Sequence, residues 1–501
     1  MGKGLTTNAM LVMQSLYGND VIPGSYNGRS VNFFISDILK PSLAVSDTPS
    51  TSSDTQPASL FLELLNNALQ SKFTTISSIP APCRISFSRT LKSCLDAVIL
   101  NPREISSWIK LLLLPICTLN LYIPKNSSEK RSGTRKRMQA ASINQDLVDW
   151  REPNGCLNLI NTLLERPKRC QLRKPKSKQA QASENLEACR KKLSYGHYTA
   201  AIKVLSSDGV TPCNEATLAE LQHKHSTAHS PAILTESISC DAISVDTASV
   251  LKAIKGFPKG TSCGCDGLRD QHLLDAMSGA ANAVADELVV SITKVVNMWL
   301  SGKCPSSLGE FISSSTLTPL QKPSGGIRQI SIGTIWRRLV SKLANTKVGK
   351  DMSVYLGDCQ FGVDVPCGER ILHSVNRSLE IKGNRSDTSM LLIDFTNAFN
   401  MVDRTSLIKE VRSHFPAISQ WVEFCFATPT RLYYKDTILS SAQGVQHGNP
   451  LGPLLFSLTL HPIVRNIASK CKLDLQAWYL DDRTIIGDTL EVYKDLQIIL
   501  A

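Results

Sequence analysis

Residues 476–488 read QAWYLDDRTIIGD and place two adjacent carboxylates, Asp481 and Asp482, between two apolar runs. Both runs alternate as short β-strands do, so the stretch predicts a hairpin with the acids at its tip. Tight hairpin turns normally favour Gly or Asn, which tolerate the required backbone angles. A solvated acidic turn is the simplest explanation of the pair. A metal site is the alternative, and it requires a third carboxylate from elsewhere in the chain.

A third carboxylate ends another apolar run. In SMLLIDFTNAFNMVDR, residues 389–404, a predicted strand ends at Asp394, and Asp403 is placed to cap the helix that follows. Three converging carboxylates suit phosphoryl transfer, in which two Mg²⁺ ions about 3.5–4 Å apart serve the attacking hydroxyl and the leaving pyrophosphate. Without cations the carboxylates would repel one another and raise each other's pKa.

The composition is that of a globular protein, and its net charge indicates a polyanionic partner, although excess charge alone can serve solubility. The 501 residues are 42% hydrophobic and 20% charged, with a formal charge of +12. Residues 124–178 hold 14 Lys and Arg against 5 Asp and Glu. Their two basic runs fit a solvated linker as well as they fit phosphate binding or a nuclear-import signal. The 15 cysteines form no CxxC pairs and no signal peptide is visible, which predicts reduced thiols inside the cell.

The hydrophobic pattern divides the chain into three parts. Residues 1–60 end in a Ser/Thr/Pro-rich linker and are expected to be poorly ordered. Residues 61–210 have the three- and four-residue apolar spacing of helices. Strand-like runs alternate with helices in residues 215–501, which predicts an α+β domain. The most apolar stretch, 111–123, is too short to span a membrane and predicts a buried helix or helix pair.

A second hairpin is predicted at TLTPLQKPSGGIRQISI, residues 316–332. Its Pro-Ser-Gly-Gly turn would bring Lys322 and Arg328 together over one polyanion, although a solvated basic turn is the simpler alternative. Further along, GVQHGNPLGP supplies a Gly-bearing loop before an apolar helix at about 453–467. There Gly448 would permit the close approach of a base or sugar.

Together these motifs resemble those of a known family. DFTNAFNMVDR, GVQHGNPLGPLLFSLTLHP and AWYLDDRTIIG, in this order, are similar to the palm motifs of reverse transcriptases, in particular those of non-long-terminal-repeat (LINE-like) retrotransposons. The stretches at 257–274, 317–344 and 360–373 resemble the fingers motifs. The resemblance covers about residues 215–501 and implies a right-hand fold of fingers and palm, with helices packed on an antiparallel palm sheet. Only 19 residues follow Asp482, which implies an incomplete domain without a thumb.

The resemblance also implies roles for individual residues. It makes Asp394, Asp481 and Asp482 a catalytic, metal-binding triad, with the backbone carbonyl of Phe395 as a further metal ligand. It makes Phe399 a steric gate that leaves no room for a ribose 2′-hydroxyl, whereas the residue type alone favours a core aromatic. Nucleotide binding is assigned to six residues: Lys322, Arg328, Phe395, Phe399, His447 and Gly448.

Three residues depart from the pattern that the family usually shows: His447, Asn449 and Arg483. His447 brings different hydrogen-bond geometry and a charge that changes near neutral pH. We expect Asn449 to cap the following helix, as Asn does well. We also expect the guanidinium of Arg483 to compete with metal for Asp482.

The implied activity is that of an RNA-directed DNA polymerase. It would use two Mg²⁺ ions, or Mn²⁺ in their place, with an RNA template, a DNA primer and deoxynucleoside triphosphates. Two alternatives stay open. One is a catalytically inactive nucleic-acid-binding relic of a retroelement, and the other is an RNA-directed RNA polymerase, against which Phe399 argues. We expect an intracellular protein without a membrane partner, and a nuclear one where the basic runs act as an import signal.

Overall fold

The computed structural model describes residues 56–71, 73–165, 178–225, 230–231, 240–322, 325–363, 368–446 and 448–500. The chain forms two compact units. The N-terminal unit comprises Ser52–Ala344 and Arg412–Pro450, and the C-terminal unit contains Asn345–Val411 and Leu451–Ala501. Each unit combines several helices with one small sheet, which confirms the α+β class.

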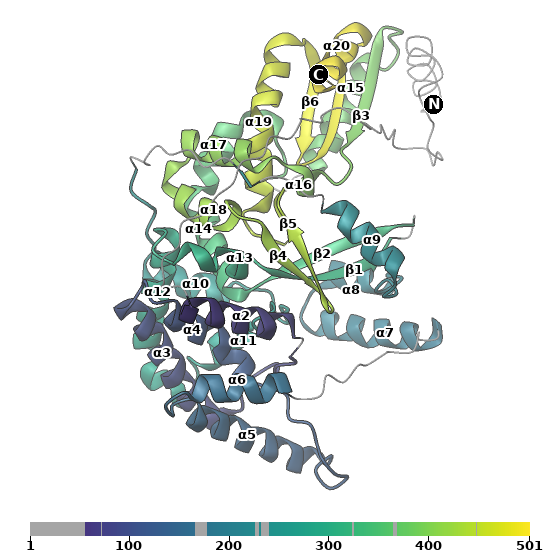
Figure 1. Ribbon diagram of the computed structural model, residues 1–501. Helices are drawn as coiled ribbons and strands as arrows, with labels where there is room; N and C mark the ends of the chain where they lie inside the picture. The colour runs from purple at the N-terminus through teal and green to yellow at the C-terminus, as the bar shows by residue number, and fades with distance from the viewer. Residues whose placement is uncertain are drawn as a thin grey trace. The chain divides into compact units, whose positions relative to one another are not determined.

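Helices dominate the N-terminal unit (Figure 1). Its α-helices are α2 (Gln56–Gln70), α3 (Arg84–Leu100), α4 (Ile105–Thr118), α5 (Ser132–Asp149), α6 (Gly155–Glu165), α7 (Lys178–Ser194), α8 (Tyr198–Leu205), α9 (Glu215–Lys224), α10 (Thr247–Lys255), α11 (Asp270–Asp275), α12 (Ala285–Leu300), α13 (Gly309–Ile312) and α18 (Ser419–Phe426). Short 3₁₀ turns are η2 (Ala81–Cys83), η3 (Gly279–Val284), η4 (Ser306–Leu308) and η6 (Pro416–Ile418). The chain passes between the units within α14 (Ile335–Leu356) and α17 (Arg404–His414).

The apolar stretch at 111–123 belongs mainly to α4, which is a single buried helix that runs through Pro115. Its Trp108 lies fully buried with its ring 5.2 Å from that of Trp299 on α12. The ring of Trp299 lies 5.7 Å from that of Trp336 on α14. This aromatic row joins helices that are distant in sequence into one core.

None of the described helices is long and apolar enough to cross a membrane.

The sheet of the N-terminal unit has the strand order β2-β1-β4-β5. Its strands are β1 (Ser315–Gln321), β2 (Ile327–Gly333), β4 (Thr430–Tyr434) and β5 (Thr437–Ser441). β1 runs antiparallel to β2 and parallel to β4. Helix α9 packs on β2, and both elements are labelled in Figure 1. Leu221 of α9 packs against Leu317, Ile327 and Leu432, so the buried side of the alternating pattern forms a core.

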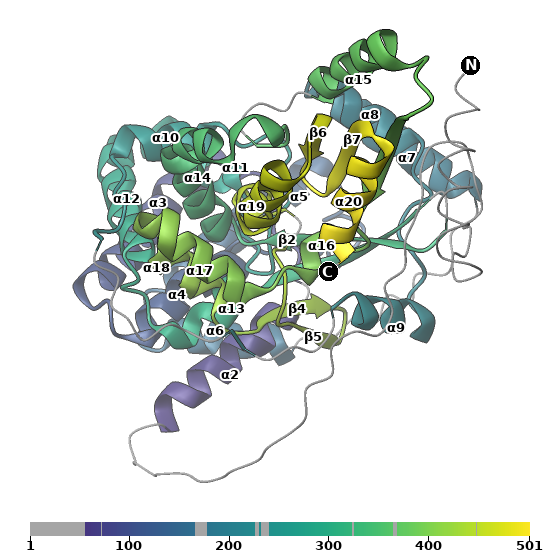
Figure 2. The same ribbon diagram turned by 90° about the horizontal axis from the view of Figure 1, so that it is seen from above.

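The C-terminal unit is built on a three-stranded antiparallel sheet in the order β3-β7-β6. The strands are β3 (Thr388–Asp394), β6 (Leu473–Tyr479) and β7 (Asp482–Asp488), and the helices are η5 (Gly357–Cys359), α15 (Gly368–Lys382), α16 (Ala398–Met401), α19 (Gly452–Lys470) and α20 (Thr489–Leu500). Figure 2 shows α19 and α20 beside β6 and β7. Val464 and Ile467 of α19 pack there on Trp478 of β6, and this core holds the sheet in place.

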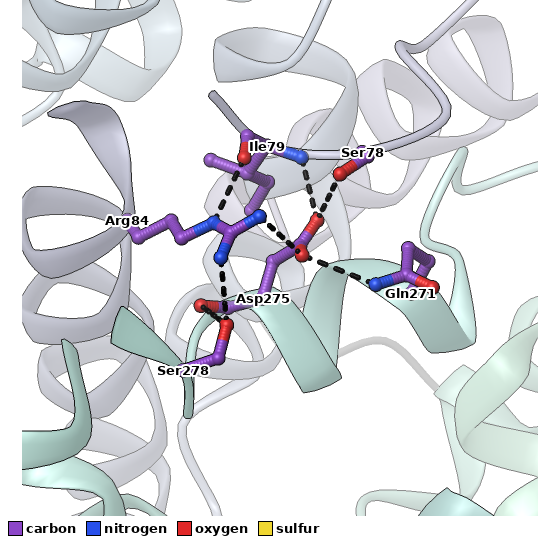
Figure 3. Close-up of polar contacts among 6 residues, drawn as sticks. All are labelled: Ser78, Ile79, Arg84, Gln271, Asp275 and Ser278. Atoms are coloured by element: carbon purple, nitrogen blue, oxygen red, sulfur yellow. Dashed lines mark hydrogen bonds and ion pairs between the residues drawn. The ribbon is translucent and has the colours of Figure 1, made fainter. Parts of the chain in front are cut away.

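Polar contacts tie the N-terminal helices to α11 within the N-terminal unit (Figure 3). The Asp275 carboxylate accepts hydrogen bonds from the backbone N–H of Ile79 and the Ser78 hydroxyl, each at 2.7 Å. It also accepts one from Gln271 at 3.1 Å and pairs with Arg84 at 2.9 Å. Four partners on one buried carboxylate offset the cost of removing its charge from water.

Two sequence expectations about helix caps have different outcomes. The Asp403 carboxylate accepts from the backbone N–H of Ser406 at 2.7 Å, just where α17 begins, so that cap is confirmed. The capping role expected of Asn449 is wrong. Helix α19 begins at Gly452, and its N-cap residue is Leu451, whose apolar side chain forms no cap hydrogen bond.

Candidate active site

The hairpin predicted at residues 476–488 is present. Strands β6 and β7 are antiparallel, with Tyr479 paired with Asp482. Leu480 and Asp481 form the two-residue turn, so Asp482 is the first residue of β7 rather than part of the tip. Leu480 has φ +59°, a left-handed conformation that costs free energy for a residue with a bulky side chain. The surrounding structure must therefore hold this turn in place.

Asp394 joins the pair through the sheet. β3 runs antiparallel to β7, and in its register Asp394 lies directly opposite Asp482. Residues opposite one another on antiparallel strands point to the same face, with Cβ atoms about 4.5–5.5 Å apart. The backbone therefore brings Asp394, Asp481 and Asp482 to one end of one sheet.

Electrostatic coupling accompanies this arrangement. The side chains of Asp394 and Asp482 are exposed, and that of Asp481 is half-buried. Desolvation raises the pKa of Asp481, and the negative charges of Asp482 and Asp394 raise it further. Desolvation and the charge of Asp394 raise the pKa of Asp482 as well. Asp481 and Asp482 thus ionise against the repulsion of neighbouring carboxylates.

Carboxylate oxygens are the ligands that Mg²⁺ prefers, so the chemistry of this donor set fits a divalent cation. Among the described residues, however, no three acidic, His or Cys side chains meet closely enough to form a metal-binding group. Like charges favour separated side chains, and a divalent cation is the species that would draw them together.

A segment before β3 supports the strained turn. The Gln360 side-chain oxygen accepts hydrogen bonds from the backbone N–H groups of Leu480 and Gly362, both at 2.9 Å. Phe361 N–H donates to the carbonyl of Trp478 at 2.7 Å. A Cβ on Gly362 would lie 2.6 Å from Leu480 Cγ, so glycine is required for this approach. Sequence reasoning did not single out Gln360, although it lies in the stretch 360–373 that carries the resemblance.

The expectation that Arg483 competes for Asp482 is wrong. Its guanidinium forms two bonds with the carboxylate of Asp495 on α20, at 2.7 and 2.5 Å. It also lies over the ring of Trp478, 4.5 Å from the centroid. Successive residues of a strand face opposite sides of the sheet, so Arg483 points away from the face that carries Asp482.

Two aromatic residues follow Asp394 in the same unit. The Phe395 ring stacks on Trp478 with centroids 6.2 Å apart and planes 7° apart, so its side chain belongs to the core. Phe399 lies on the short helix α16 and is 8% exposed. Its ring stacks on Phe456 of α19 at 4.6 Å and 11°. This stack forms a rigid aromatic wall five residues after Asp394.

The basic hairpin belongs to the N-terminal unit. Lys322 donates its backbone N–H to Gly326 at 3.0 Å and so faces Gly326 across the hairpin, while Leu320 pairs with Arg328. This register puts Lys322 and Arg328 on the same face as diagonal neighbours, about 7–8 Å apart between backbones. The Arg328 side chain is exposed and that of Lys322 is half-buried. The intervening residues 323–324 lie outside the described residues.

The sequence predicted that Gly448 would permit the close approach of a base or sugar. In the structure the group that lies close to Gly448 is backbone of this chain, on strand β2. Its φ is +94°, and an added Cβ would lie 2.7 Å from the carbonyl oxygen of Ser331 on β2. The loop is thus seated on the β1–β2 hairpin with no room for a side chain. The neighbouring His447 lies outside the described residues.

Gln446, two residues earlier, anchors this loop and was not singled out from the sequence. Its side-chain oxygen accepts hydrogen bonds from Ser315 at 2.8 Å and from the buried guanidinium of Arg337. Its amide nitrogen donates to the Thr430 hydroxyl at 2.6 Å. Gln446 lies within the motif GVQHGNPLGP, but among its polar and glycine neighbours no local pattern distinguishes its side chain, because its partners come from distant segments.

Two comparisons with known proteins bear on this site. Residues 320–501 match the family model described as reverse transcriptase (RNA-dependent DNA polymerase). The chain is also similar to the retrotransposable element SLACS 132 kDa protein of Trypanosoma brucei gambiense, with 27% identity over 258 residues. That alignment covers 50% of this chain and 21% of the relative, so the chain spans about a fifth of the relative's length.

Residues 320–501, which contain the acid-bearing sheet, are therefore a reverse transcriptase domain. Together with the retrotransposon relative and the motifs, this identifies the domain as one of a non-long-terminal-repeat retrotransposon. The family is one of RNA-directed DNA polymerases, which in general act on an RNA template with nucleotide substrates and divalent metal ions.

Proposed function

We propose that this chain is an RNA-directed DNA polymerase of retrotransposon origin, which adds deoxynucleotides to a DNA primer on an RNA template. The observation that carries the proposal is the pairing of Asp394 with Asp482, beside Asp481, at one end of the sheet β3-β7-β6. In this proposal that sheet and its helices are the palm, and the β1–β2 hairpin belongs to the fingers. The polymerase would occupy residues 215–501, after a helical region at 61–210, and would act inside the cell.

Asp394, Asp481 and Asp482 would hold two divalent ions, Mg²⁺ or Mn²⁺ in its place, and the Phe395 carbonyl would add an oxygen ligand. Such ions, when bound, activate the primer hydroxyl and stabilise the leaving pyrophosphate. The coupling of the carboxylates supports this role, because their mutual repulsion makes the site favourable for cations.

The remaining residues would bind and orient the nucleotide. Lys322 and Arg328, on one face of their hairpin, would offset the charge of the triphosphate. Phe399, held against Phe456, would exclude a ribose 2′-hydroxyl and so favour deoxynucleotides. His447 and Gly448 would contact the base or sugar, and Gly448, the described residue of the two, lies beside β2. The template would be held by backbone charge and stacking, neither of which reads sequence.

Primer extension tests the proposal. The purified chain is given an RNA template, a DNA primer, deoxynucleotides and Mg²⁺, beside the Asp481→Ala, Asp482→Ala double variant. We expect extension by the first protein and none by the second. No extension by either, with RNA still retained in a filter-binding assay, would overturn the proposal in favour of an inactive nucleic-acid-binding relic. Extension only with ribonucleotides would overturn it in favour of an RNA polymerase.

A further inference from the structure

A buried ion pair holds the start of strand β7 from the side opposite to the acids. Arg483 and Asp495 both have side chains with 0% exposure. The two hydrogen bonds between them join the two terminal guanidinium nitrogens, Nη1 and Nη2, to the two carboxylate oxygens. Trp478, directly across the sheet from Arg483, lies beneath the guanidinium. Strand β7, strand β6 and helix α20 therefore meet at one side chain.

Stability alone does not require charge at this position. Removing two charges from water is costly, and well-packed apolar residues of similar volume commonly stabilise a protein equally well or better. Apolar residues at positions 483 and 495 would have apolar neighbours to pack against, because Trp478 and Ile485 are fully buried on the same sheet. The ion pair differs from an apolar contact in its geometry, since a planar fork bonded at two points allows one orientation.

That orientation bears on the acids. Arg483 follows Asp482 directly in the strand, so a fixed Arg483 also fixes the backbone from which the Asp482 carboxylate projects on the other face. Arg483 fixes the backbone at the start of β7, close to Leu480, whose backbone conformation is strained. Strand ends next to strained turns readily fray unless side chains hold them.

We propose that Arg483, bonded to Asp495 and stacked on Trp478, is a positioning residue that sets the direction of the Asp482 carboxylate for metal binding. The inference rests on the proposed polymerase function. It assigns to Arg483 a role in the geometry of the site, with no contact to substrate or metal. Supporting groups of this kind typically change metal affinity or activity by about 10–100-fold.

The test replaces the pair by apolar residues, in the variant Arg483→Met with Asp495→Leu. A matched control replaces a second two-pronged pair remote in sequence from the acids, Arg412→Met with Glu423→Leu, whose bonds measure 2.6 and 2.8 Å. Circular dichroism and thermal unfolding establish that each protein folds. Three quantities are then measured: Mn²⁺ affinity by electron paramagnetic resonance, the Mg²⁺ concentration for half-maximal primer extension, and kcat and KM for a deoxynucleotide.

The first variant should fold and bind Mn²⁺ about 10–100-fold more weakly, with a raised Mg²⁺ requirement and a lowered kcat. The control should match the wild type in all three quantities. Arg483→Lys keeps a positive charge for Asp495 but loses the two-point hydrogen bonding and the stacking on Trp478. Its Mn²⁺ affinity and kcat should lie between those of the wild type and those of the apolar double variant. If the apolar double variant does not fold, the Arg483→Lys variant tests the inference in its place.

Unchanged Mn²⁺ affinity, Mg²⁺ requirement and kcat in a folded Arg483 variant would overturn the inference and leave the polymerase proposal standing. A wild type that extends no primer would overturn the polymerase proposal instead. The Mn²⁺ measurement needs no catalysis, so it would then decide the inference alone. Equal Mn²⁺ affinity in wild type and variant would reject it.

Discussion

Asp394 and Asp482 lie directly opposite each other across β3 and β7. Asp394 is the last residue of β3 and Asp482 is the first residue of β7, so both lie at the same end of the sheet. Desolvation and the charge of Asp394 raise the pKa of Asp482. Two carboxylates in this register destabilise the sheet unless a cation lies between them. The pairing therefore has a cost to folding, which a cation bound at the proposed site would offset.

Replacement of Asp481 by Asn should lower primer extension at least about 100-fold, because the proposed site loses a carboxylate that would hold the divalent ions. The chain offers a matched control in a second hairpin. Its turn, Lys435-Asp436, repeats the turn Leu480-Asp481, with φ +52° and +59° at the first residue of each. Asp436→Asn should leave extension within about twofold of wild type. Equal losses in both variants would mean that the turn, and not the site, is affected.

Phe399→Leu should relax the choice between deoxynucleotides and ribonucleotides by roughly 10-fold or more, measured as the ratio of their kcat/KM values. A smaller side chain would leave room for the 2′-hydroxyl. The control is Phe456→Leu, which loses the same stacking interaction from the other side. It should cost similar stability without changing the ratio. An equal change in both variants would assign Phe399 to the core alone.

Gly448→Ala should lower the free energy of unfolding more than Gly325→Ala does. Both glycines have positive φ, at +94° and +86°, so alanine is strained at each. Only at Gly448 does an added Cβ also meet a fixed atom, the Ser331 carbonyl, whereas nothing lies within 4 Å at Gly325. The clash should add about 1–3 kcal/mol, measured by chemical denaturation. Equal losses would show that the loop can move away from β2.

Asp275→Ala should destabilise the N-terminal unit by about 3 kcal/mol, because Arg84 and the N–H of Ile79 lose a buried partner (Figure 3). Glu287→Ala removes an exposed carboxylate 3.6 Å from Lys92 and should cost under about 1 kcal/mol. Thermal unfolding measures both. Losses of equal size would contradict a specific tie between the N-terminal helices and α11.

His272 should make stability depend on pH. Its Nε2–H donates to the carbonyl of Ile76 at 2.7 Å and its Nδ1 accepts from the N–H of Arg269 at 3.3 Å, so the buried ring is neutral. Burial lowers its pKa from 6.5 to about 4. As pH falls below 6.5 the unfolded chain gains a proton that the folded chain refuses, and stability falls by about 1.4 kcal/mol per pH unit until about pH 4.

The difference in unfolding free energy between wild type and His272→Gln measures this effect, because Gln does not titrate. Other groups titrate in both proteins and cancel. The advantage of the wild type should be constant above pH 6.5 and shrink by about 3 kcal/mol on the way to pH 4. A difference that is independent of pH would contradict a buried neutral histidine.

Local patterns were readable from the sequence. The alternation around residues 476–488 predicted β6 and β7, and the spacing of Asp403 predicted the start of α17, because strand pleat and helix caps depend on residues a few positions apart. The order of the motifs indicated the reverse transcriptase domain. Asn449 failed as a cap since the start of α19 depends on how its loop is held, and spacing does not encode that.

By itself the sequence determined the strands, the turn and the chemical identity of the three acids. The tertiary structure decided which strand lies beside which. It paired Asp394 with Asp482, turned Arg483 towards Asp495 on α20, and brought Gln360 to the turn. These contacts join segments distant in the chain, and their free energy comes from burial and long-range hydrogen bonds that exist only once the core has formed.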